Sequence, residues 1–151
     1  MKTPLRFTLL ALSLATAARS ADDAPSLVKY RQSCMKSIGA HMSAMSLVVK
    51  KKVTRRTDLA SHAEAIHALS ANLPGLFPNG TDPSKVTTAA LPAIWSEPAK
   101  FVAAAKTLER ESARLAELAR KGDAVAFDAQ FARVGDACSA CHKTFRERQS
   151  D

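Results

Sequence analysis

Two cysteines and one histidine lie within five residues of one another near the end of the chain, in the segment CSACH from Cys138 to His142. If this segment is helical, spacings of three and four residues bring both thiols and the imidazole onto adjoining parts of one face. Such a face suits a flat cofactor that offers two reactive carbon groups to the sulfurs and a metal ion to the imidazole.

C-x-x-C-H is the attachment pattern of c-type haem, in which the two vinyl groups take the sulfurs as thioethers and the iron takes the imidazole. The sequence therefore predicts one covalently bound haem c, attached through Cys138 and Cys141 and ligated by His142. Only nine residues follow His142, so we expect any second axial ligand to come from upstream in the chain.

Three other uses of the two cysteines are less consistent with the sequence. Zinc needs further Cys or His ligands at a suitable spacing, and no second paired motif is present. A redox-active C-x-x-C usually lies at a helix N-terminus, where the helix dipole lowers a thiol pKa, whereas this pair is predicted well inside a helix. A disulfide between residues three apart in a helix has poor geometry. The third cysteine, Cys34, is expected to behave as a small buried hydrophobe, with an intermolecular disulfide as the alternative.

The first twenty residues are typical of a secretory signal peptide. Lys2 and Arg6 precede a short apolar run, which is followed by small residues near the expected cleavage point. The run is shorter than the roughly 20 residues that a membrane-spanning helix needs. We therefore expect residues 1–20 to be removed, leaving residues 21–151 as a periplasmic domain without stable membrane insertion.

The charge pattern gives little support to nucleic-acid binding. The formal charge of +8 falls to +5 when the three basic residues of the signal segment are removed. The remaining charges are scattered and no aromatic platform accompanies them. The one dense basic run, KKKVTRR from Lys50 to Arg56, is interpreted as a solvated connection between helices, with a docking patch as the alternative.

The composition favours helices, because the chain is rich in Ala, Leu, Lys and Glu. Apolar spacing, caps and prolines predict four of them, at about 26–52, 57–73, 97–121 (capped by Ser96) and 124–148 (capped by Asp123). The segment between the second and third helices holds four of the seven prolines, and so long a loop in a compact domain usually covers a site. The predicted fold is all-α, an antiparallel four-helix bundle with one long loop between the second and third helices.

Three segments together resemble the class II cytochromes c, the cytochrome c-prime family: YRQSCM, LPAIWSEPAKF and CSACHKTFR. The resemblance covers essentially all of residues 21–151 and implies a left-handed four-helix bundle with haem between the helices. It also implies that Arg31 and Gln32 lie against the haem edge and propionates. Arg146, one turn after His142, would lie near the proximal imidazole.

The family divides on the residue four positions after the YRQ arginine, which here is Met35. In five-coordinate members an apolar side chain closes this side and small gases such as nitric oxide can bind; in low-spin members a methionine ligates the iron. The segment YRQSCMKSIGAHMSAM is more similar to the methionine-ligated branch. A thioether ligand favours reduced iron and raises the potential, which suits electron transfer.

The sequence thus predicts a periplasmic electron-transfer haem protein rather than an enzyme, with iron ligated by His142 and Met35. The alternative is a five-coordinate protein that binds or handles nitric oxide, with Met35 only filling the core. Met42 and Met45 are expected in the core, and no role as ligand is expected for the histidines His41, His62 and His67. The expected partners are redox proteins, and the resemblance also allows a homodimer.

Overall fold

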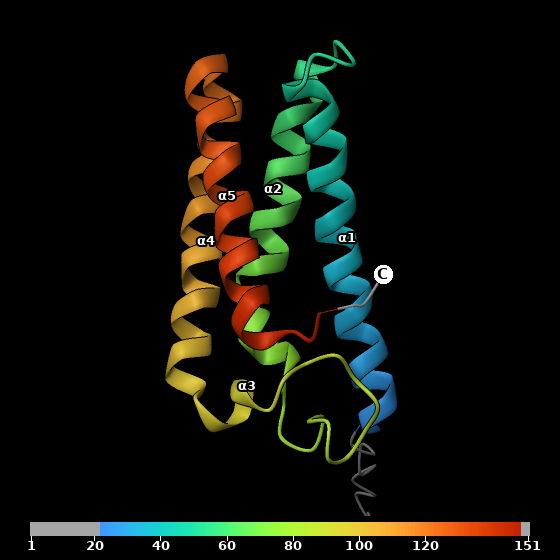
Figure 1. Ribbon diagram of the computed structural model, residues 1–151. Helices are drawn as coiled ribbons and strands as arrows, with labels where there is room; N and C mark the ends of the chain where they lie inside the picture. Colours follow the sequence, from blue (N-terminus) through green and yellow to red (C-terminus); the bar gives the residue numbers. More distant parts are fainter. Residues whose placement is uncertain (1–21, 149–151) are drawn as a thin grey trace, which may run out of the picture.

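The computed structural model describes residues 22–148, and the four long helices in it form an antiparallel bundle (Figure 1). The predicted signal peptide lies outside the described residues. The all-α fold and the long loop between the second and third main helices are confirmed. The elements are α1 (Ala24–Val49), η1 (Arg56–Asp58), α2 (Leu59–Ser70), η2 (Leu73–Leu76), α3 (Ala93–Ser96), α4 (Pro98–Lys121) and α5 (Ala124–Phe145).

Side-chain caps and backbone geometry set the helix ends. Asp23 accepts a hydrogen bond from the Ser26 N–H at 2.9 Å, so α1 begins two residues before its predicted start. α1 ends at Val49 instead of Lys52, because the chain turns through Lys51, whose φ is 57°. Asp123 caps α5 as predicted, accepting from the Ala126 N–H at 3.0 Å.

Three other predicted ends are wrong by a few residues. α2 stops at Ser70, because Pro74 lacks the N–H that would continue its hydrogen bonding. Ser96 does not cap the third long helix: it ends the separate turn α3, and α4 begins at Pro98. α5 ends at Phe145, before the predicted Arg148, because the backbone becomes extended at the next residue.

The core lies along the middle of the bundle, where α1 packs on α2, α2 on α4 and α4 on α5. Met45 is fully buried there, as predicted, and Met42 packs against the core from a half-buried position. Phe101 makes edge-to-face contacts with Phe77 and Phe145, at centroid distances of 4.9 and 5.3 Å. Across residues 22–148, none of the helices has the length and apolar character that crossing a membrane requires.

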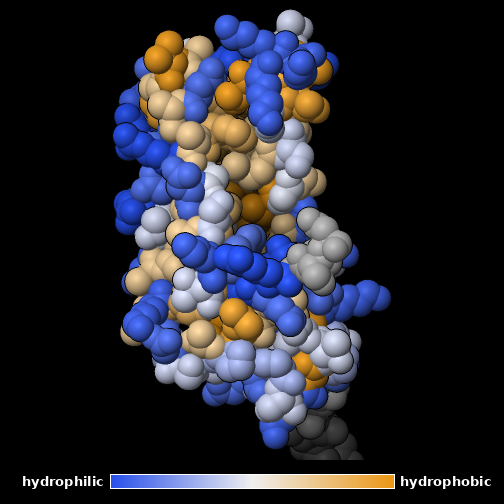
Figure 2. Space-filling model, in the orientation of Figure 1, coloured by the Kyte–Doolittle hydropathy of each residue, from blue (hydrophilic) through white to orange (hydrophobic). Residues whose placement is uncertain are grey.

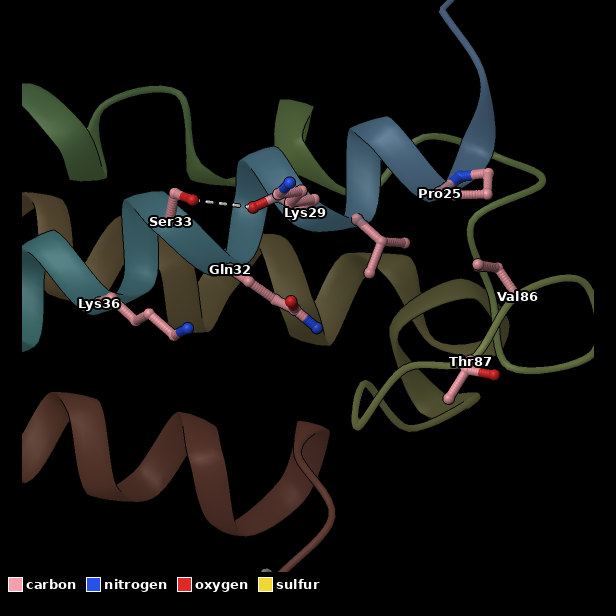
Figure 3. Close-up of a pocket in the computed structure, with 8 residues that line it drawn as sticks. Pro25, Lys29, Gln32, Ser33, Lys36, Val86 and Thr87 are labelled. Carbon is pink, nitrogen blue, oxygen red and sulfur yellow. Dashed lines mark hydrogen bonds between the residues drawn. The ribbon is translucent and has the colours of Figure 1, made fainter.

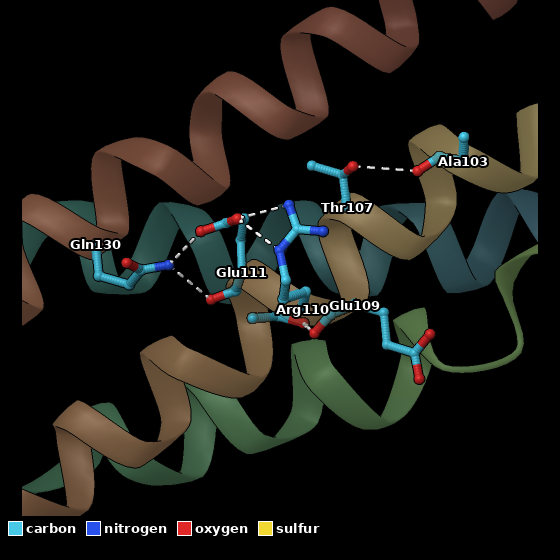
Figure 4. A network of polar contacts seen from close by, with 7 residues as sticks. Ala103, Thr107, Glu109, Arg110, Glu111 and Gln130 are labelled. Atoms are coloured by element: carbon cyan, nitrogen blue, oxygen red, sulfur yellow. Dashed lines mark hydrogen bonds and ion pairs between the residues drawn. The ribbon is translucent and has the colours of Figure 1, made fainter. Parts of the chain in front are cut away.

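A buried polar contact fixes the packing of α4 against α5 (Figure 4). Gln130 on α5 donates from Nε2 to the backbone carbonyl of Glu111 at 3.0 Å and to its carboxylate at 2.8 Å. Arg110 donates to the other carboxylate oxygen at 3.0 Å. The carboxylate therefore accepts from both sides, and these hydrogen bonds hold its pKa below the usual value.

The long loop is joined to the chain that follows α5. The Leu91 N–H donates to the Phe145 carbonyl at 3.0 Å, and the Glu147 N–H donates to the Ala89 carbonyl at 2.8 Å. These bonds flank an antiparallel bridge between Ala90 and Arg146. In Figure 1 the loop crosses the end of the bundle where α5 terminates. The loop is thus fixed beside the last turn of α5, which carries His142.

Candidate haem site

The C-x-x-C-H residues occupy the last two turns of α5. Cys138 and Cys141 are half-buried and pack against the hydrophobic core, while His142 is exposed. Both cysteines are free thiols. The helix continues through all three residues, so the predicted arrangement on adjoining parts of one face is present.

The surroundings of the two thiols and the imidazole shift their pKa values. Desolvation raises the pKa of the Cys138 thiol, and desolvation together with the neighbouring thiol raises the pKa of Cys141 to about 11. Both are therefore protonated at neutral pH, unlike the low-pKa thiolate of a thiol oxidoreductase. Although His142 is exposed as a residue, partial desolvation of its ring and the positive charge of Arg146 lower its pKa. Its imidazole is therefore neutral at neutral pH and has a lone pair for a metal ion.

The side of α5 toward α1 borders an open part of the bundle. α1 and α5 make little direct contact. Figure 2 shows a hollow between the two helices with hydrophobic residues at its floor. A cavity of about 630 Å³ opens on the α1 side of this space. Its lining residues are Pro25, Val28, Lys29, Gln32, Ser33, Lys36, Val86 and Thr87.

The chemistry of this space fits a haem. Gln32 and Lys36 extend from α1 toward α5 (Figure 3), and Lys29 also lines the cavity. An amide and two ammonium groups can meet the two carboxylates of a porphyrin, while the apolar floor can meet its ring. Two protonated thiols and a neutral imidazole complete the set of groups that covalent attachment and iron ligation need. Gln32 lines the cavity beside α1, whereas the C-x-x-C-H residues are not among its lining residues.

Arg31 is placed differently from Gln32. Its side chain is only 3% exposed, and it binds the long loop. One terminal nitrogen donates to the Thr81 hydroxyl at 2.7 Å, and the other donates to the Thr81 carbonyl at 3.0 Å and the Thr88 hydroxyl at 2.7 Å. The guanidinium also stacks over Phe77 and Trp95, at 4.8 and 5.7 Å from the ring centroids.

These contacts give Arg31 a structural role that the sequence did not reveal. Within residues 22–148 no carboxylate lies within ion-pairing distance of it, and burial lowers its pKa. The two threonines that satisfy it were not predicted. The proline-rich loop was the available signal, because it was expected to cover a site, but nothing in its sequence identifies which of its residues face α1.

Met35 lies one helical turn after Arg31 and is half-buried. Like Cys138 and Cys141, it packs against the hydrophobic core that runs through the bundle. Trp95 and Phe77 pack edge-to-face beside the loop, with 6.2 Å between the ring centroids.

The histidines outside the motif lie elsewhere. The Nδ1 atoms of His41 and His62 approach each other at 2.9 Å between α1 and α2. The Nδ1 atom of His67 is buried without a hydrogen-bond partner in the described part of the chain. Among residues 22–148, no group of three or more His, Cys, Asp or Glu side chains is arranged to hold a metal ion.

Comparisons with known proteins agree with this geometry. The profile of the family described as Cytochrome C' matches residues 26–146. Cytochrome c' of Pararhodospirillum photometricum is 38% identical over 120 residues, which cover 80% of this chain and 95% of the relative. Cytochrome c-556 of Agrobacterium tumefaciens is 32% identical over 123 residues, which cover 79% of this chain and 95% of the relative.

Solved structures show the same bundle. A variant of cytochrome c prime from Alcaligenes xylosoxidans, in its nitric oxide complex, superposes with a TM-score of 0.78 at 29% identity. The match covers 86% of this chain and all of the other. The profile, the curated relatives and the fold all point the same way, and the chain belongs to the cytochrome c' family of haem proteins.

Proposed function

We propose that the protein is an electron carrier with one covalent haem c, whose iron is ligated by His142 on one side and Met35 on the other. The observation that carries the proposal is the place of Met35. Its thioether lies one turn from the buried Arg31, on α1, which borders the open side of α5, and it is half-buried.

Each residue then has a defined task. Cys138 and Cys141 hold the cofactor through two thioether bonds, and His142 presents a neutral imidazole to the iron. Gln32, Lys29 and Lys36 provide polar contacts for its carboxylates, while the hydrophobic floor of the hollow excludes water. A bound haem supplies an iron that accepts and releases one electron. The protein sets the potential through the thioether ligand and the dryness of the pocket.

A second candidate function is gas binding by a five-coordinate haem, with Met35 only packing. The specific observation in its favour is that a structural neighbour is a nitric oxide complex of cytochrome c prime. Another relative is named cytochrome c-556, and that name does not mention nitric oxide. The two functions differ in what occupies the sixth position of the iron.

The optical spectrum of the pure holoprotein separates them. Methionine ligation predicts a low-spin spectrum with a thioether–iron charge-transfer band in the ferric form and slow carbon monoxide uptake. The Met35→Ala variant should become high-spin and take up carbon monoxide readily. Met42→Ala is the matched control, because Met42 lies on the same helix and packs against the core. An unchanged spin state in Met35→Ala would show that Met35 is not a ligand.

The proposed place of action is the periplasm, reached through the signal at residues 1–20. The support is the sequence pattern of those residues and the need for thioether attachment outside the cytoplasm. The mass of the protein purified from an exporting host tests it. The expected mass is that of a chain beginning near residue 21 plus one haem, and a chain that keeps residues 1–20 would contradict it.

A further inference from the structure

The end of the bundle farthest from the long loop carries an excess of positive charge. Lys50, Lys51 and Lys52 follow α1 directly and are all exposed. Lys51 adopts a left-handed conformation with φ of 57°, and the Lys52 N–H turns back to the Leu47 carbonyl at 2.8 Å. Three consecutive exposed lysines therefore lie in and beside this tight turn.

The carboxylates at this end are already engaged by other groups. Asp58 pairs with Arg55, and Asp128 pairs with Arg56 at 2.8 Å. Asp123 accepts the N–H that caps α5. In the part of the chain that the structure describes, none of the three lysines forms an ion pair. Their charge is therefore free to act on a partner.

Exposed aliphatic side chains are also found at this end of the bundle. The described residues include four strongly exposed large hydrophobic side chains, and three are at this end: Leu47, Val53 and Val125, which are 50%, 40% and 83% exposed. The Val53 N–H donates to the Leu47 carbonyl at 3.3 Å, so these two are neighbours. Arg56 reaches the carbonyl before Val125, that of Ala124, at 3.2 Å. Figure 2 shows hydrophobic atoms among hydrophilic ones at this end.

We propose that this surface, Leu47, Lys50–Lys52, Val53 and Val125, docks the protein on an anionic lipid bilayer. Lysines attract the negative lipid headgroups, and protruding aliphatic side chains enter the boundary between headgroups and acyl chains. A protein partner fits less well, because the cores of protein–protein interfaces are depleted in lysine. At a bilayer, the lysine stems lie along the apolar boundary while the ammonium groups remain in water.

The position of this surface determines the orientation of the docked protein. α5 begins beside the surface at Ala124 and reaches His142 about 27 Å farther along its axis, at about 1.5 Å per residue. The haem-attachment residues would therefore point away from the bilayer, where a partner in solution can approach them. The proposal depends on surface residues only and does not rest on which ligand the iron has.

Vesicle flotation of the mature holoprotein tests the proposal. One vesicle set is equimolar phosphatidylglycerol and phosphatidylcholine, and the other is pure phosphatidylcholine. The holoprotein should float with the anionic set only, and more weakly as salt is added. Replacing Lys50, Lys51 and Lys52 together by Gln should lower the partition coefficient by roughly 100-fold. Leu47→Ser with Val125→Ser should lower it by roughly tenfold.

The matched control replaces three exposed lysines elsewhere, Lys85, Lys100 and Lys106, by Gln, with the same change in net charge. It should float like the original protein. Equal losses in both triple variants would show a general charge effect and overturn the proposal, as would absence of flotation of the original protein. Sedimentation equilibrium tests whether a second copy of the chain occupies this surface instead. A dimer that dissociates in the Leu47→Ser, Val125→Ser variant, from a protein that binds no vesicles, would overturn the bilayer proposal.

Discussion

The two sides of α5 are built in opposite ways. Toward α4 the seam is closed by apolar side chains and by Gln130, which reaches the backbone and the carboxylate of Glu111. Toward α1 direct contact is slight, and a haem attached to Cys138 and Cys141 would fill this side under the proposed function. The closed seam fixes the position of α5, so that the other seam can remain open for a cofactor without loss of the fold.

The largest expected effect comes from removing the two thiols that would attach a haem in the open seam. Replacing Cys138 and Cys141 together by Ala should abolish covalent haem, because no thioether can form. Haem staining after denaturing electrophoresis measures this, since only covalently attached haem stays with the chain. Cys34→Ala is the control: this thiol is buried on α1, outside the motif, and the stain should remain. A stained band from the double variant would contradict covalent attachment at these two residues.

Arg31 tests how the open seam is held at one end. Arg31→Lys keeps the charge but loses the forked geometry that binds both Thr81 and Thr88. We therefore expect the free energy of unfolding to fall by about 3 kcal/mol. Hydrogen exchange in the loop, residues 77–92, should accelerate, while exchange in α4 and α5 changes less. Denaturant unfolding of the holoprotein gives the free energy.

The control for this change is Arg114→Lys, on the exposed surface of α4, where the guanidinium pairs with Glu117 at 2.6 Å. A surface pair contributes little, and the expected change is within about 0.5 kcal/mol. If Arg31→Lys proves as mild as this control, the loop is held mainly by its backbone bonds to the chain after α5, and the threonine contacts add little.

Local signals explain which parts of this comparison could be predicted from the sequence. Asp123 caps α5 and Gly122, with φ of 72°, ends α4, because each acts within one turn of its own position. The C-x-x-C-H motif could be predicted for the same reason, because its three functional residues lie within five positions. The partners of Arg31 lie 50 and 57 residues away in a loop without periodicity, so only the folded chain brings them together. The Ser96 cap was wrong for a related reason, because a separate turn, α3, uses that residue.

The closed seam is tested by Gln130→Ala, which removes the donor from α5 to the Glu111 carbonyl and leaves the carboxylate with Arg110 alone. Loss of a buried donor to a charged group should lower the free energy of unfolding by about 2 kcal/mol. Thr107→Ala is the control, because its hydroxyl bonds only within α4, to Ala103 at 3.1 Å, and little change is expected (Figure 4). If Gln130→Ala loosens α5, haem exposure should rise as well, because the open seam keeps its width only while α4 holds α5 in place. A stable variant with an unchanged haem spectrum would instead show that apolar packing alone closes that seam.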